Sequence, residues 1–115
     1  MVSQSLVQEI IHLQADFCSA LSDPTRLLIL YALAEKPRNV TELTNDLVLT
    51  QPTASRHLKV LRERGLVHTV RSGTTITYSL SDLRLIDAID LLRMVMRDRI
   101  AYHANLLEEI EETSG

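Results

Sequence analysis

Apolar residues recur at helical spacing over most of the chain, and strand-like runs occupy one short region. The helical spacing covers residues 3–21, a segment from Asp23-Pro24 to about Ala34, two short segments within residues 41–65, and residues 82–112. Between them, residues 66–80 form two β-prone runs around a turn signal. The pattern predicts a mainly α fold of about five helices with a small two-stranded β-hairpin.

Residues 41–65 predict two short helices joined by a tight turn. Thr50 stands where the N-cap of the second helix belongs, and Pro52 lies in its first turn, where a missing N–H costs little. Inward-facing apolar residues follow at i, i+4 and i+7, namely Ala54, Leu58 and Leu61. The opposite face is polar and basic and carries Gln51, Thr53, Ser55, Arg56, Lys59 and Arg62. Such a helix suits entry into a DNA major groove, although an ordinary amphipathic helical hairpin has the same pattern.

The β-prone runs directly follow this two-helix unit. Residues 66–71 precede Ser72-Gly73, and residues 74–80 complete the predicted hairpin. A helix-turn-helix followed at once by a hairpin is the winged-helix arrangement, so we expect Arg71 near the wing tip, where it can meet backbone phosphate. We expect His57, on the second helix, either to pack that helix or to contact phosphate.

The first and last predicted helices, about residues 3–21 and 82–112, carry more apolar surface than a small core can cover. The last stripe continues over roughly 30 residues, or about 45 Å of helix. We therefore expect both helices to form the interface of a homodimer, within a single domain spanning residues 1–115. Two reading helices would then meet successive turns of a palindromic DNA site, about 34 Å apart.

The charge distribution favours a nucleic-acid partner even though the net charge of the 115-residue chain is −3. Basic residues dominate from Arg56 to Arg71, whereas the tail from Glu108 to Glu112 holds four acids and no base. DNA binding needs a local positive surface rather than a positive total. No run is long enough to span a bilayer, and a single cysteine excludes an intrachain disulfide, so we expect a cytoplasmic protein with no membrane partner.

Three phrases resemble the ArsR/SmtB family of bacterial winged-helix repressors: ALSDPTRLLILYALAEKP, TELTNDLVLTQPTASRHLKVLRERGLV and RSGTTITYSL. The resemblance covers about residues 15–82. It implies an elongated homodimer that binds an operator and releases it when an inducer binds. By motif position it implies base or phosphate contacts from the second helix and the wing, and the DNA-binding set is Gln51, Thr53, Ser55, Arg56, His57, Lys59, Arg71, Ser72, Gly73 and Thr74.

The metal sites of this family are not expected in this chain. The thiol site needs paired cysteines after Glu42-Leu43, but Thr44, Asn45 and Asp46 stand there. At the site on the last helix, Asp82 and Arg84 precede Val95 and Asp98, so two of four ligands are lost. The cofactor therefore stays unknown, and the sequence requires none.

Other candidates for effector chemistry lie on the two predicted dimer helices. His12 and Asp16 are four apart and could share a metal ion, with His103 as a further candidate, although interfacial polar residues explain both histidines. Cys18 could respond to oxidation or pack as a small buried hydrophobe.

No motif indicates an enzyme. We expect a homodimeric, sequence-specific transcriptional regulator, a repressor released by an inducer or a redox signal. The alternative is a winged-helix protein-interaction or architectural module without an inducer.

Overall fold

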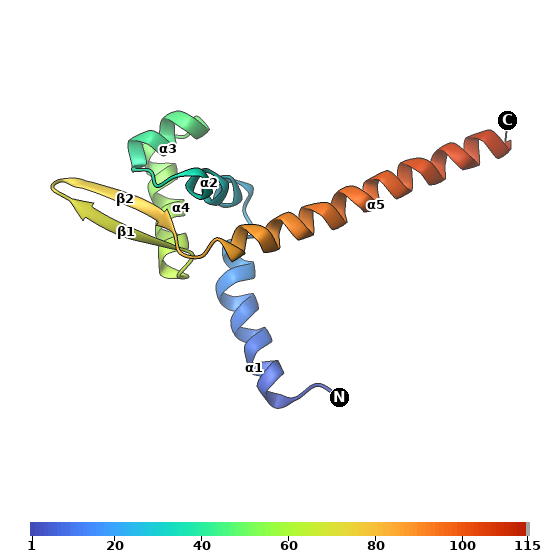
Figure 1. Cartoon of the computed structure of the whole chain (residues 1–115), viewed down its shortest axis with the longest axis horizontal. Coiled ribbons are helices and arrows are strands. Elements are labelled where there is room, and N and C mark those ends of the chain that lie inside the picture. The colour runs from blue at the N-terminus through green and yellow to red at the C-terminus, as the bar shows by residue number, and fades with distance from the viewer. Residues whose placement is uncertain (115) are drawn as a thin grey trace. The chain divides into compact units, whose positions relative to one another are not determined.

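The computed structural model describes residues 1–114 (Figure 1). Five α-helices and one hairpin follow in the order α1 (Gln4–His12), η1 (Leu13–Cys18, a π-helix), α2 (Pro24–Glu35), α3 (Val40–Leu47), α4 (Gln51–Glu63), β1 (Val67–Ser72), β2 (Thr75–Leu80) and α5 (Arg84–Ser114). The predicted winged helix-turn-helix with a two-stranded wing is confirmed. The chain divides into two units, Met1–Leu83 and the helix that begins at Arg84.

Side-chain caps determine where α2, α3 and α4 begin, and the Ser3 hydroxyl likewise caps α1. The Asp23 carboxylate accepts hydrogen bonds at the start of α2, with Pro24 as the first helical residue, as predicted. Thr50 caps α4, also as predicted, and its hydroxyl accepts from the Thr53 N–H at 3.3 Å. At α3 the prediction began one residue late, because Asn39 forms a reciprocal capping box with Glu42 and brings Val40 into the helix.

The core of the first unit lies where α2, α3, α4 and the hairpin meet. Its six largest fully buried side chains are Ile29, Leu30, Leu43, Leu58, Leu61 and Leu66. The predicted inward face of α4 is confirmed, because Ala54, Leu58 and Leu61 are all fully buried. Helix α2 is not buried all round, because Ile29 and Leu30 are fully buried whereas Leu28 is 56% exposed.

The hairpin is antiparallel, with Val67 opposite Leu80 and Ser72 opposite Thr75. Its two-residue turn is Gly73-Thr74, one position later than predicted. Gly73 has a φ of 63°, a left-handed conformation that only glycine adopts at little cost, so the tightest connection falls there.

Arg38 joins the helical part of the first unit to the wing. Its backbone forms a two-way bridge with Tyr78 of β2, with N···O distances of 3.0 and 2.8 Å. Its buried guanidinium donates to Asp46 at 2.7 Å and to Glu35 at 2.9 Å. Because these contacts join α2, α3 and β2, the position of the wing is fixed relative to the helix-turn-helix.

The N-terminal helical segment is confirmed as a nearly continuous helix, but its inner half is widened. From Leu13 to Cys18 the hydrogen bonds follow the π-helical pattern, which places one extra residue in a turn. Every residue of α1 is exposed, including Leu6, Val7, Ile10 and Ile11. The first unit therefore leaves the apolar face of this segment uncovered.

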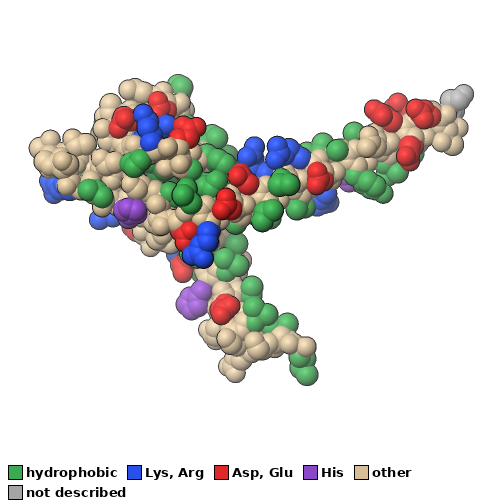
Figure 2. All heavy atoms as spheres, viewed as in Figure 1, with side chains coloured by type: hydrophobic (Ala, Val, Ile, Leu, Met, Phe, Trp, Pro, Cys, Tyr) green, Lys and Arg blue, Asp and Glu red, His purple; other side chains and the backbone are tan. Residues whose placement is uncertain are grey.

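Helix α5 is 31 residues long, within two residues of the prediction at either end. Leu92, Ile100 and Leu107 are each more than 60% exposed. Figure 2 shows acidic side chains gathered near the C-terminal end of α5 and basic ones farther toward its start. Helix α5 thus exposes apolar side chains along most of its length.

Candidate nucleic-acid interface

The turn between α3 and α4 presents α4 with a polar outward face. Val48 ends α3 in the left-handed region, with φ 55° and ψ 54°, and this reverses the chain before Thr50. Beyond the turn, Gln51, Ser55, Arg56 and Lys59 are exposed, and Thr53 is half-buried. The predicted polar face of α4 is thus formed by side chains that can reach a ligand.

The first turn of α4 is organised by its threonines. Thr50 donates its hydroxyl proton to the Thr53 hydroxyl at 2.8 Å while accepting from the Thr53 N–H. The positive end of the helix dipole lies here, beside Gln51, and it favours an approaching phosphate. Farther along, Arg56 and Lys59 add cations to the same exposed side.

The assignment of His57 to the DNA-contacting residues is wrong. Its side chain is on the core face of α4 and the residue is only 6% exposed. The Arg26 guanidinium lies 3.3 Å from His57 Nδ1, and the Asp23 carboxylate lies 4.0 Å from Nε2. His57 therefore packs the helix, which was the other expectation for it.

Asp23 is a carboxylate stabilised by its role as a cap. Desolvation raises its pKa, but the backbone N–H groups of Arg26 and Thr25 donate to it, and the side chains of His57 and Arg26 also favour the charged form. The pKa of Asp23 consequently lies below its ordinary value.

The wing tip is exposed and carries one cation. Arg71, Ser72, Gly73 and Thr74 are all solvent-accessible. The Arg71 side chain folds back, and its Nε donates to the Gly73 carbonyl at 3.4 Å. A single exposed hydrogen bond of this length leaves the guanidinium able to turn toward a phosphate.

Two residues that position this interface were missed at the level of sequence. Arg26 and Arg38 are both held by partners from distant parts of the chain, His57 and Tyr78 respectively. No local spacing marks such contacts. An arginine directly after a capped helix start, and another between Pro37 and the Asn39 cap, were the available signals.

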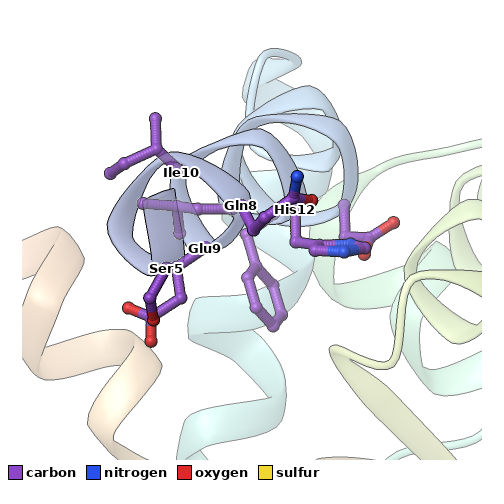
Figure 3. A pocket seen from close by; sticks show the side chains of 8 residues that line it. Ser5, Gln8, Glu9, Ile10 and His12 are labelled. Atoms are coloured by element: carbon purple, nitrogen blue, oxygen red, sulfur yellow. The ribbon is translucent and has the colours of Figure 1, made fainter. Parts of the chain in front are cut away.

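The effector candidates are scattered over the structure. His12 and Asp16 both line an open hollow along α1 and η1, shown in Figure 3. Asp16, however, pairs with Arg64 at 3.4 Å. His103 lies on α5, and Cys18 is exposed at the end of η1. Among residues 1–114, no group of three or more histidine, cysteine or acidic side chains has a geometry that could hold a metal ion.

Comparison with known proteins identifies the class. A model of bacterial regulatory proteins of the arsR family matches residues 23–69, from the N-cap of α2 into β1. The HTH-type transcriptional repressor SmtB of Mycobacterium tuberculosis is 38% identical over 78 residues, which are 68% of this chain and 58% of that protein. A probable mercury resistance operon repressor of Streptomyces lividans is 36% identical over 87 residues, covering 76% of this chain and 70% of that protein.

A solved structure agrees with the sequence matches. The homodimeric winged helix-turn-helix DNA-binding domain of a possible ArsR-family transcriptional regulator from Mycobacterium bovis superimposes with a TM-score of 0.74 at 26% identity. The alignment covers 88% of this chain and 93% of that domain.

The fold and the exposed face of α4 thus define a winged helix-turn-helix protein of the regulatory class. The chain belongs to the ArsR family, as its phrases suggested, and the relatives are transcriptional regulators rather than enzymes. It spans less than two thirds of the length of SmtB. None of the helices within residues 1–114 is both long and apolar enough to cross a membrane.

Proposed function

We propose that this protein is a homodimeric repressor that binds a palindromic operator in double-stranded DNA, in the cytoplasm, and leaves it when an effector binds. The observation that carries the proposal is the division of α4 into two faces. Ala54, Leu58 and Leu61 anchor the helix, while Gln51, Ser55, Arg56 and Lys59 point to solvent. Glutamine and arginine can read base edges, and cations meet phosphates.

The wing extends the DNA contact beyond α4. Arg71 stands at its exposed tip, and Arg38 holds β2 to the helical part of the unit. In our proposal α4 enters the major groove while Arg71, Ser72 and Thr74 meet the neighbouring backbone. Wing contacts of this kind orient the protein without reading sequence.

The homodimer is supported by apolar surface that one chain leaves uncovered. The N-terminal segment exposes Ile10 and Ile11, and α5 exposes Leu92 and Ile100. Patches of this kind on a small protein mark interaction sites. A second copy would cover them and place two α4 helices on half-sites about 34 Å apart.

The decisive experiment selects duplexes from a random DNA library with the purified full-length chain. An inverted repeat with half-sites about one helical turn apart is expected. Arg56→Ala should then weaken binding to the selected duplex by tenfold or more, because a bidentate base contact contributes about 1–3 kcal/mol. Lys36→Ala, which removes an exposed cation at the end of α2, is the matched control and should bind nearly as wild type.

Two outcomes would refute the assignment. Enrichment of no sequence at all would remove sequence-specific binding and favour the interaction-module alternative. Selective binding by Arg56→Ala with unchanged affinity would show that α4 is not the reading helix.

In our proposal, a chemical change at Cys18 is the signal that releases the protein from DNA. Its thiol is exposed on the segment that we assign to the dimer interface, so oxidation or alkylation there would alter subunit packing. We expect oxidant to weaken DNA binding by wild type and to leave Cys18→Ser unaffected. Anisotropy titrations under reducing and oxidising conditions measure this, and an equal response of both proteins would exclude the thiol as the switch.

A further inference from the structure

The Arg26 guanidinium contacts two segments that lie far apart in sequence. Its Nε donates to the Ala20 carbonyl at 2.6 Å, and its Nη2 donates to the Ser19 carbonyl at 3.4 Å. These carbonyls belong to the C-terminal end of the N-terminal helical segment, beyond its last regular helical hydrogen bonds, and the Ser19 carbonyl also accepts from the Ser22 hydroxyl at 2.7 Å. The third nitrogen, Nη1, lies 3.3 Å from His57 Nδ1 on α4.

The contact with His57 fixes the imidazole in one arrangement. Arginine has no acceptor and keeps its protons, so Nδ1 must accept through its lone pair. The ring proton is then on Nε2, on the side of the Asp23 carboxylate 4.0 Å away. His57 itself is buried beside Leu58 on the core face of α4, so it cannot move without moving the helix.

A second contact also joins the N-terminal helical segment to α4. Arg64, the C-cap residue of α4, lies 3.4 Å from Asp16 of η1. His57 and Arg64 are seven residues apart, or about 10 Å along a helix. One contact would fix only a position, whereas two separated contacts also constrain the direction of the α4 axis. Of the two, the Arg26–His57 contact is partly buried and is therefore less screened by water than the exposed Arg64–Asp16 pair.

We propose that Arg26 is a positioning residue for DNA binding, which holds α4 in its reading orientation relative to residues 13–20. The inference rests on the proposed function, in which α4 reads the operator. When the N-terminal segment is displaced, the Ser19 and Ala20 carbonyls move with it. Because Arg26 is bonded to these carbonyls and contacts His57, the displacement shifts His57 and with it α4. Residues 13–20 thereby become the place where a change at the subunit interface alters DNA affinity.

The test uses four full-length variants and the selected duplex. Arg26→Gln removes the guanidinium that joins Ser19 and Ala20 to His57. His57→Leu puts an apolar side chain of similar size in place of the imidazole and removes the hydrogen-bond acceptor. Each of these two single substitutions should weaken DNA binding by about tenfold or more. The double variant should bind DNA no more weakly than the single variant with the lower affinity, because both substitutions remove the same Arg26–His57 contact. His57→Gln, whose amide oxygen can accept from Arg26, should restore affinity to within about threefold of wild type.

Lys36→Gln is the matched control, because it removes an exposed cation from the other end of α2. It should bind DNA as wild type does. Thermal unfolding of every variant separates loss of positioning from loss of folding. The proposal would be overturned if the affinity losses of the two single variants multiplied in the double variant. It would also be overturned if His57→Gln bound DNA as weakly as His57→Leu. Losses in affinity that simply follow the losses in stability would overturn it as well.

An imidazole ¹⁵N spectrum of the wild-type protein needs neither DNA nor a variant. The tautomer expected from the Arg26 contact has an unprotonated Nδ1 and a protonated Nε2. A protonated Nδ1 would contradict the Arg26 contact whether or not the chain binds DNA. If the spectrum is as expected but no duplex is selected, the proposed function fails while the bridge remains.

Discussion

Helices α4 and α5 are both amphipathic, but they differ in what covers their apolar faces. In α4 the apolar residues Ala54, Leu58 and Leu61 are fully buried within one chain, and only the polar face is exposed. In α5 the apolar residues Leu92 and Ile100 are exposed instead. The first helix is thus complete in the monomer and lacks only a polar ligand. The second has an exposed apolar surface, which in our proposal the other subunit covers.

The largest expected effect is on stability, and it distinguishes a buried leucine of α4 from an exposed leucine of α5. Leu58→Ala should lower the free energy of unfolding by about 2–5 kcal/mol, because it leaves a cavity in a filled core. Leu92→Ala, at 67% exposure, should leave the intrinsic stability of one chain nearly unchanged and weaken dimerisation instead. Denaturant titrations over a range of protein concentrations separate the two effects. If Leu92→Ala changes neither quantity, this part of α5 is not an interface.

A smaller effect is expected at the turn that sets the orientation of α4. Val48 is β-branched and left-handed with a φ of 55°, a conformation that costs a non-glycine residue about 1–2 kcal/mol. Glycine relieves this strain but adds freedom to the unfolded chain. Val48→Gly should therefore stabilise the protein by up to about 1 kcal/mol. A lower melting temperature for this variant would show that contacts of the valine outweigh its backbone strain.

The smallest effect concerns the cap that begins α2. The pKa of Asp23 is lowered in the folded protein, so its charge stabilises the fold above the unfolded pKa of about 3.9. That contribution is lost as the pH falls through the folded pKa. Asp23→Asn keeps a capping oxygen without the charge, so it should be slightly less stable than wild type at pH 7 and equal to it in strong acid. A stability difference that does not change between pH 7 and pH 2 would contradict this account.

Most of the fold followed from local signals. Capping residues placed the starts of α2 and α4, and the spacing of Ala54, Leu58 and Leu61 gave the buried face of α4. The same spacing favours the packing alternative for His57, because 54, 57, 58 and 61 form one i, i+3, i+4, i+7 stripe. Histidine is only sometimes fully buried, so residue type alone does not choose between the packing and the phosphate-contacting alternatives.

What the sequence could not predict were the long-range contacts. Arg26 meets His57 across 31 positions, and Arg38 bridges to Tyr78 in β2. These contacts orient the reading helix and the wing, yet they leave no periodic pattern. The hairpin turn was misplaced by one residue because its position depends on the left-handed φ of Gly73 rather than on composition.

In our proposal, two copies of this chain act together on one duplex. Native mass spectrometry of the complex with the selected duplex measures this stoichiometry directly. We expect two chains per duplex and a free protein that is already dimeric at micromolar concentration. A complex of one chain per duplex, or a monomer that binds with full affinity, would contradict it.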